Sequence, residues 1–232
     1  MNYTLILLAA GSGRRMKASK NKVFLELDGI SIIERTLSVF LADDECCRVL
    51  LVIKKSEKIE IQKLFADRIY SRVEFVIGGE ERQDSVFKAV QELDIKDEYV
   101  MIHDGVRVFV TKAELDRLKQ SVLNFSVALL GIPVKDTIKQ VNSAGQVCAT
   151  IPRNELWQAQ TPQMFHVEIL KKVHKKAQQA RFLGTDDVSL VEKFFPEEKI
   201  CMIMGNDENI KLTTPVDLLF GEVILKRRGD LL

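Results

Sequence analysis

A glycine-rich loop followed by a run of cations is the first feature of the sequence that could perform chemistry. The segment Ala9-Ala-Gly-Ser-Gly-Arg-Arg-Met16 is followed by Lys17, Lys20 and Lys22, with no acidic residue before Glu26. Glycine lets backbone N–H groups turn towards a phosphate without a Cβ in the way. A tight turn with a solvated basic face is the simpler interpretation, but five cations beside backbone amides suit a polyphosphate.

Two well-known phosphate-binding loops do not match this segment. The dinucleotide fingerprint requires a third Gly or Ala where Met16 stands, and the Walker A loop requires a Gly-Lys-Ser/Thr ending that is absent. Nucleotidyl transfer needs neither loop. Its nucleophile can be a phosphate monoester, which is already mostly dianionic at neutral pH because its second pKa is about 6. No catalytic base is then required, and the sequence offers no Ser-His-Asp or Cys-His set.

The first loop and Lys22-Val-Phe-Leu25 resemble the sugar-phosphate cytidylyltransferases. Six further segments resemble the same family, and they follow in order along nearly the whole chain. Each is a weak signal alone, but their order and spacing are specific. The segments are Gly78-Gly-Glu-Glu-Arg82 with Ser85-Val86, His103-Asp104 with Arg107, Pro133-Val-Lys-Asp-Thr-Ile-Lys139, Leu156-Trp-Gln-Ala-Gln-Thr-Pro-Gln163, Thr185-Asp-Asp187 with Ser189 and Glu192, and Asn209-Ile-Lys-Leu-Thr-Thr-Pro215.

The resemblance implies transfer of CMP from CTP to a sugar-alcohol phosphate, with release of pyrophosphate and with Mg²⁺ as the cofactor. The implied acceptor is 2-C-methyl-D-erythritol 4-phosphate of non-mevalonate isoprenoid synthesis, which the segment 185–192 favours; ribitol 5-phosphate of teichoic acid synthesis is the alternative. The implied catalytic residues are Arg15, Lys22, Arg153 and Lys211. The implied nucleotide contacts are Ala9, Ala10, Gly11, Gly13, Gly79, Glu80, Ser85, Asp104 and Arg107. The implied acceptor contacts are Thr137, Arg153, Thr161 and Lys211. Asp104 is also the implied metal ligand, although Mg²⁺ would bind mainly through the CTP phosphates.

Several of these residues have a structural interpretation as well. His103 at a strand end is more typical of a structural histidine than of a catalytic one. Asp104 could form a turn, and Ser85 could cap a helix as well as contact the base. The sequence also departs from the family pattern at Asn21, where proline is usual, and at Gly105 and Val108, where alanine and proline are usual. These departures affect fine geometry and leave the reaction class unchanged.

Alternating apolar runs and helical patterns predict the elements that hold these residues. They predict an α/β fold with a mostly parallel, Rossmann-like nucleotidyltransferase sheet, helices on both faces and a protruding β-hairpin arm. We expect one domain over 1–232, with the arm at about 134–152. The expected strands are Thr4–Ala9, Arg48–Ile53, Arg72–Ile77, Tyr99–His103, Val127–Ile132 and Lys199–Met204. The expected helices are Ser31–Leu41, Glu57–Ala66, Asp84–Leu93, Lys112–Leu123, Val167–Ala180 and Pro215–Lys226.

The arm predicts a homodimer. Lys135–Val141 and Gln146–Ile151 form two polar strands around the turn Asn142-Ser-Ala-Gly145. An isolated two-stranded hairpin is marginal in water, so the arm needs a surface to pack on, and a two-fold pair of arms would supply one. By resemblance, Thr137 and Arg153 of one chain complete the site of the other.

Composition excludes several classes. A net charge of +1 over 232 residues gives no sign of a nucleic-acid or membrane-surface binder. No apolar run approaches the ~20 residues of a membrane span, and we expect no signal peptide and no fused second catalytic domain. The four cysteines contain no C-x-x-C pair, which disfavours zinc, and cytoplasmic residence follows. A nucleotide-binding module without catalysis and an NAD-dependent oxidoreductase are the competing classes; the retained cations disfavour the first, and Met16 the second.

Overall fold

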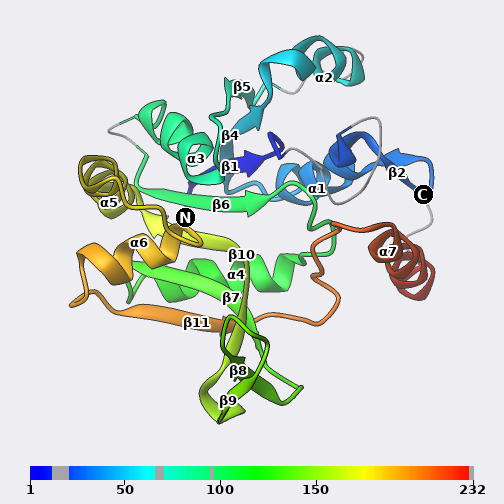
Figure 1. The fold of residues 1–232 in the computed structure, drawn as a ribbon. Helices are drawn as coiled ribbons and strands as arrows, with labels where there is room; N and C mark the ends of the chain where they lie inside the picture. The colour runs from blue at the N-terminus through cyan, green and yellow to red at the C-terminus, as the bar shows by residue number, and fades with distance from the viewer. Residues whose placement is uncertain (12–20, 66–70, 95–96, 230–232) are drawn as a thin grey trace.

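The computed structural model describes residues 1–11, 21–65, 71–94 and 97–229, so the predicted contacts Gly13 and Arg15 lie outside the described residues. A seven-stranded sheet forms the centre of the molecule (Figure 1). All neighbouring strands are parallel except where β10 meets β6 and β7. The predicted α/β class is confirmed. In spatial order the strands are β11 (Ile200–Met204), β7 (Val127–Pro133), β10 (Trp157–His166), β6 (Tyr99–Asp104), β1 (Tyr3–Leu8), β4 (Cys46–Ile53) and β5 (Val73–Ile77).

The continuous apolar sequence of β1 follows from its central position. Leu5 and Leu7 pack into the core on one face of the sheet, and Ile6 packs into the core on the other. Because β1 lies between β6 and β4, both its faces and both its edges are covered, so every position can be apolar.

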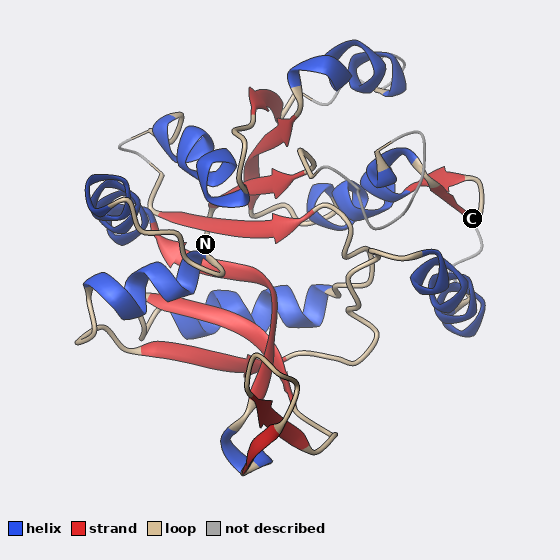
Figure 2. Ribbon diagram, in the orientation of Figure 1, coloured by secondary structure: helices blue, strands red, loops and turns tan. Residues whose placement is uncertain are grey.

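Helices cover both faces of this sheet (Figure 2). Residues of α1, α2, α4 and α7 join the first core, and residues of α3, α5 and α6 join the second. No helix in the described ranges is long and apolar enough to cross a membrane. The helices are α1 (Ile32–Leu41), α2 (Lys58–Leu64), α3 (Arg82–Gln91), α4 (Lys112–Val122), α5 (Val167–Ala180), α6 (Asp187–Phe194) and α7 (Pro215–Arg228).

Among the strands and α-helices, one long strand, one helix and one small hairpin were not predicted. Strand β10 runs through the segment 156–163 that the sequence showed only as a motif; its first three residues are exposed, and Gln160 to Phe165 are buried. Helix α6 lies in the segment 185–192, and a small hairpin joins β2 (Glu26–Leu27) to β3 (Ile30–Ser31).

The predicted arm is present as the two-stranded sheet of β8 (Ile138–Val141) and β9 (Val147–Ile151), which projects below the main sheet in Figure 1. Gly145 has φ +77° in its turn, a conformation that favours glycine. Every side chain of β8 is exposed. Within the chain, the arm therefore has no core of its own.

Candidate active site

A cavity of about 710 Å³ opens beside the carboxyl ends of β1 and β6, where ligands bind in open α/β sheets. Six separate stretches of the chain contribute to its walls. The walls are lined by Leu8, Ala9, Ala10, Gly11, Lys22, Val23, Lys54, Gly79, Glu80, Glu81, Arg82, Ser85, Asp104, Val106, Lys211 and Thr213. Most of the predicted nucleotide contacts and both described lysines of the predicted catalytic set meet here.

The wall formed by the loop between β5 and α3 is closely packed. The Gly79 N–H donates to Ser85 Oγ at 3.0 Å. A Cβ at Gly79 would lie 2.3 Å from Asp84 Cβ, so only glycine fits there. Ser85 lies in the first turn of α3 but does not cap it, because Glu81 is the N-cap and forms a capping box with Asp84. The Ser85 hydroxyl therefore holds the loop that lines the cavity.

Asn21 fixes the start of the turn that carries Lys22. Its Nδ2 donates to the Ala9 carbonyl oxygen at 3.0 Å and to Glu57 Oε2 at 2.9 Å, and its Oδ1 accepts from the Val23 N–H at 3.4 Å. Asn21 has φ −61°, which proline also adopts. The departure from the usual proline thus keeps the backbone geometry and adds side-chain bonds to the end of β1.

The second departure, Gly105, has a packing reason. Its N–H donates to the Leu8 carbonyl oxygen at 2.9 Å, and a Cβ built on it would lie 2.8 Å from that same oxygen. The close approach of β6 to β1, rather than backbone freedom, accounts for glycine here. Val108, the third departure, is buried in the first core.

Asp104 lies at the end of β6 among three cations. Its Oδ2 is 2.7 Å from Lys211 Nζ and 3.6 Å from Arg107 Nε, and its Oδ1 is 3.6 Å from Arg82 Nε. Burial alone would raise the pKa of Asp104, but Lys211, Arg82 and Arg107 outweigh it and hold this pKa well below its ordinary value. Asp104 is therefore an anion at any physiological pH.

His103 and Thr161 support Asp104 from below. His103 Nε2 donates to the Arg107 carbonyl oxygen at 2.9 Å, so Nδ1 accepts from the Thr161 hydroxyl, also at 2.9 Å. The Thr161 oxygen in turn accepts the Asp104 N–H at 3.1 Å. Burial lowers the pKa of His103 to about 4, which keeps the ring neutral. The structural interpretation of His103 is the one that this geometry supports.

Four predicted site residues do not line this cavity. The side chains of Thr161 and Arg107 are hydrogen-bonded to other residues behind the cavity wall. Thr161 bonds to His103, and the Arg107 guanidinium donates to the Asn209 carbonyl oxygen at 2.6 Å. Thr137 and Arg153 lie exposed in and beside the arm, where the Arg153 guanidinium donates to the Lys135 carbonyl oxygen. The chain's own fold does not bring the two arm residues to its own cavity.

Two cations of the cavity were not predicted as site residues. Arg82 was part of a quoted segment, but nothing in the sequence gave it a role. Lys54 follows the carboxyl end of β4 and pairs with Glu57 at 3.4 Å. Its position after a parallel strand is the signal that could have identified it.

The carboxylates of the cavity bear on metal binding. Within the described ranges, no three His, Cys, Asp or Glu residues gather in a group that could hold a metal ion. Mg²⁺ commonly binds through one or two carboxylates plus substrate phosphates, and Asp104 at the cavity wall fits that pattern.

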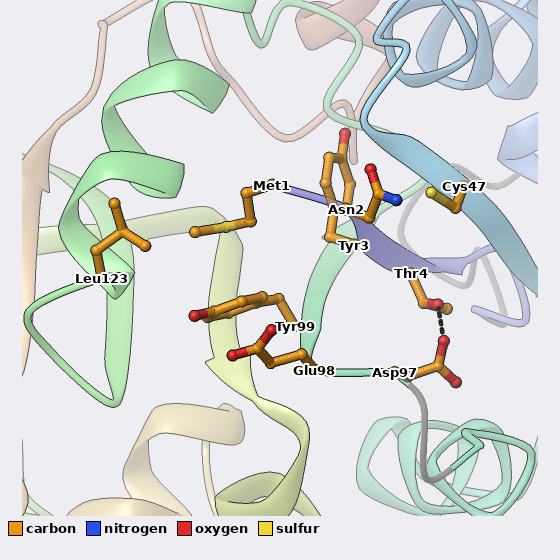
Figure 3. Close-up of a pocket in the computed structure, with 9 residues that line it drawn as sticks. All are labelled: Met1, Asn2, Tyr3, Thr4, Cys47, Asp97, Glu98, Tyr99 and Leu123. Atoms are coloured by element: carbon orange, nitrogen blue, oxygen red, sulfur yellow. Dashed lines mark hydrogen bonds between the residues drawn. The ribbon is translucent and has the colours of Figure 1, made fainter.

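A second cavity, of about 580 Å³, lies at the opposite ends of these two strands, and Figure 3 shows the residues that line it. It is formed at the amino ends of β1 and β6, with Tyr3, Thr4 and Tyr99 among its walls. The Thr4 hydroxyl donates to Asp97 across its floor at 2.8 Å. It lies at the wrong end of parallel strands and holds none of the predicted site residues.

Comparison with known proteins gives one consistent result. A family model described as 2-C-methyl-D-erythritol 4-phosphate cytidylyltransferase matches residues 3–227. A protein of that name from Geobacillus kaustophilus (strain HTA426) is 47% identical over 229 residues, covering 98% of this chain and 99% of its own. One from Bacillus velezensis (strain DSM 23117 / BGSC 10A6 / LMG 26770 / FZB42) is 43% identical over 227 residues, covering 97% of each. The crystal structure of 4-diphosphocytidyl-2C-methyl-D-erythritol synthase from Anaerococcus prevotii DSM 20548 superposes with a TM-score of 0.87 at 29% identity, over 97% of this chain and 96% of that one.

Proposed function

The chain belongs to the family of 2-C-methyl-D-erythritol 4-phosphate cytidylyltransferases, and from this premise we propose how its cavity carries out the reaction. The enzyme transfers CMP from CTP to 2-C-methyl-D-erythritol 4-phosphate, giving 4-diphosphocytidyl-2-C-methyl-D-erythritol and pyrophosphate for isoprenoid precursor synthesis. The observation that carries the proposal is the set of cations around one cavity at the ends of β1 and β6. The names of the relatives support methylerythritol phosphate over ribitol phosphate as the acceptor.

The reaction places a phosphate dianion against a triphosphate. An oxygen of the acceptor phosphate attacks the α-phosphorus of CTP, the new P–O bond forms, and the bond from the α-phosphorus to the bridging oxygen breaks as pyrophosphate leaves. Lys22 and Arg15 stabilise the charge that builds on the transferred phosphoryl group and the leaving group, while Lys211 holds the acceptor phosphate. His103 is neutral and buried, so no proton transfer is assigned to it.

Cytosine is recognised by backbone groups in this proposal. The Ala9–Gly11 segment presents main-chain groups and Gly79 presents its carbonyl oxygen, all with little side-chain bulk, so a pyrimidine can approach closely. Glu80 and Ser85 complete this wall. Asp104 would hold Mg²⁺ together with the CTP phosphates. When bound, Mg²⁺ neutralises phosphate charge.

We further propose that the enzyme is a homodimer with shared sites. Thr137 and Arg153 lie away from their own cavity, which is what a role in the neighbouring cavity requires. Exposed large apolar side chains also gather on two elements and mark interaction surfaces. They are Ile138, Val141 and Val147 on the arm, and Val216, Leu219, Phe220 and Val223 on α7.

The four cysteines are unpaired, which supports a reducing compartment such as the cytoplasm.

Subunit complementation tests the shared site. Arg153→Ala and Lys22→Ala proteins, each inactive, are mixed and allowed to exchange subunits. If Arg153 serves the partner, each heterodimer holds one intact site and one doubly defective site, and a 1:1 mixture recovers about a quarter of wild-type activity. Unchanged activity despite demonstrated exchange would show that Arg153 serves its own chain. Deleting 136–151 should give a monomer that binds CTP but hardly turns over.

A side-by-side assay tests the reaction itself. Pyrophosphate release from CTP is measured with 2-C-methyl-D-erythritol 4-phosphate and with ribitol 5-phosphate, and the product is identified by mass. We expect turnover with the first acceptor and little with the second. Preference for ribitol 5-phosphate would assign the enzyme to the other branch, and tight CTP binding without turnover by either would favour a module without catalysis.

A further inference from the structure

One arginine of the cavity wall is bonded to a buried carboxylate that lies outside the cavity. Arg82, the first residue of α3, lines the cavity and keeps 30% of its side chain exposed. Its Nη1 donates to Asp187 Oδ2 at 2.7 Å, while its Nε stays 3.6 Å from Asp104 Oδ1. The strong bond of Arg82 is thus made to Asp187, on the side of α6, and not to the acid in the cavity.

Asp187 is buried behind this contact. It is the first residue of α6 and only 1% exposed, and its Oδ1 lies 3.3 Å from His174 Nε2 of α5. Burial alone would raise the pKa of Asp187, but Arg82 and His174 outweigh it and keep this pKa below its ordinary value. A fixed buried anion therefore determines where the Arg82 guanidinium sits.

The segment around Asp187 also anchors the N-terminal end of α3. The Gln83 side chain donates to the Phe182 carbonyl oxygen at 2.9 Å and accepts from the Gly184 N–H at 2.8 Å. Residues about a hundred positions apart are thereby tied at one point of the cavity wall. Phe182 and Gly184, which directly precede the motif at 185–192, supply this tie.

Stability alone is a poor explanation for the pair. Taking the Asp187 carboxylate out of water costs free energy, and well-packed apolar residues of similar volume are often as stable as a buried ion pair or more so. A buried acid that aims an exposed arginine into a cation-lined cavity is instead typical of a site that orients a donor.

We propose that Arg82 is a further phosphate-contacting residue of the cavity and that Asp187 is its positioning residue. The phosphate belongs to CTP or to the acceptor, and both present the same oxygen chemistry. This inference rests on the proposal that the cavity is the site of CMP transfer. Asp187 accepts the hydrogen bond from Arg82 Nη1. The other N–H groups of the Arg82 guanidinium can then donate to a phosphate that binds beside Asp104.

A double-mutant cycle tests the pair. Arg82→Gln, Asp187→Asn and the double variant are compared in kcat and in KM for each substrate, with calorimetric CTP affinity and melting temperature measured alongside. The matched control is Asp186→Asn, which changes the neighbouring carboxylate that caps α6 and accepts from Gln163 at 2.7 Å but does not bond to Arg82. Asparagine keeps the cap, so the control should turn over normally.

We expect Arg82→Gln to lower turnover by ~10² and Asp187→Asn by ~10 or more, the scale of a removed or misplaced contact. The double variant should be no worse than Arg82→Gln alone, because Asp187 acts through Arg82. The substrate whose KM rises identifies the phosphate. If the losses of turnover in the two single variants multiply in the double variant, or if Arg82→Gln leaves turnover unchanged, the inference is overturned. The Arg82→Gln result is decisive even if Asp187→Asn fails to fold. Lys22→Ala, assayed in parallel, separates this failure from failure of the proposed site.

Discussion

Lys211→Ala should separate function from stability. Lys211 is the cation closest to Asp104, at 2.7 Å, and its side chain is 37% exposed at the cavity. A charge-assisted hydrogen bond contributes about 1.5–3 kcal/mol when buried, but solvent screening reduces an exposed pair towards ~1 kcal/mol. Asp104 also keeps Arg82 and Arg107, each at 3.6 Å. We therefore expect the free energy of unfolding to fall by only ~1 kcal/mol, which lowers the melting temperature by about 2–4 °C for a chain of this size.

Turnover should respond far more strongly. Removing one donor to a developing or approaching charge costs ~10²–10³ in rate. We expect this loss in Lys211→Ala, together with a larger rise in KM for methylerythritol phosphate than for CTP. The assay is pyrophosphate release with each substrate varied in turn, and the control is Lys175→Ala, an exposed lysine of α5 outside the cavity. A changed KM for CTP with an unchanged acceptor KM would show that Lys211 has been given the wrong role.

Three further outcomes are expected. Lys22→Ala and Arg15→Ala should each lower turnover by at least ~10² with little loss of stability; rates within about threefold of wild type for both would sink their assignment. Asn21→Ala should lower turnover by ~10 because Lys22 is then less well placed, whereas Asn21→Pro, which suits φ −61°, should keep most of it; equal rates in the two variants would contradict this. Since the pKa of His103 is lowered to about 4 in the folded chain, the unfolded chain binds the proton first as the pH falls. The free energy of unfolding should therefore decrease between pH 6.5 and pH 4 by about 3 kcal/mol more in wild type than in His103→Asn. Parallel pH profiles would exclude this effect.

The sequence predicted those parts of the fold that have a local cause. Continuous apolar runs marked the buried parallel strands, and the turn at Gly145 marked the arm. Strand β10 was missed because its polar side chains bond to residues distant in the sequence: Gln160 donates to the Asn206 carbonyl oxygen at 2.9 Å, and Gln163 donates to Asp186 at 2.7 Å. Periodicity alone carries no trace of such partners.

The candidate site divides in the same way. The first loop follows β1 and Asp104 ends β6, and a position at the carboxyl end of a parallel strand predicts a ligand site. The contact of Arg82 with Asp187 joins residues 105 positions apart, and no spacing rule reaches that far. Likewise, the hydrogen bonds of Asn21 could not be read from its departure from proline, because they depend on where Glu57 lies after folding.

A crystal structure of the enzyme with CTP and Mg²⁺ would show where the nucleotide binds. We predict cytosine against Gly79 and Ser85, and the triphosphate towards Lys22 in the cavity at the carboxyl ends of β1 and β6. A nucleotide bound at the amino ends of β1 and β6, in the cavity of Figure 3, would contradict the proposed site, and so would a triphosphate that lies away from Lys22.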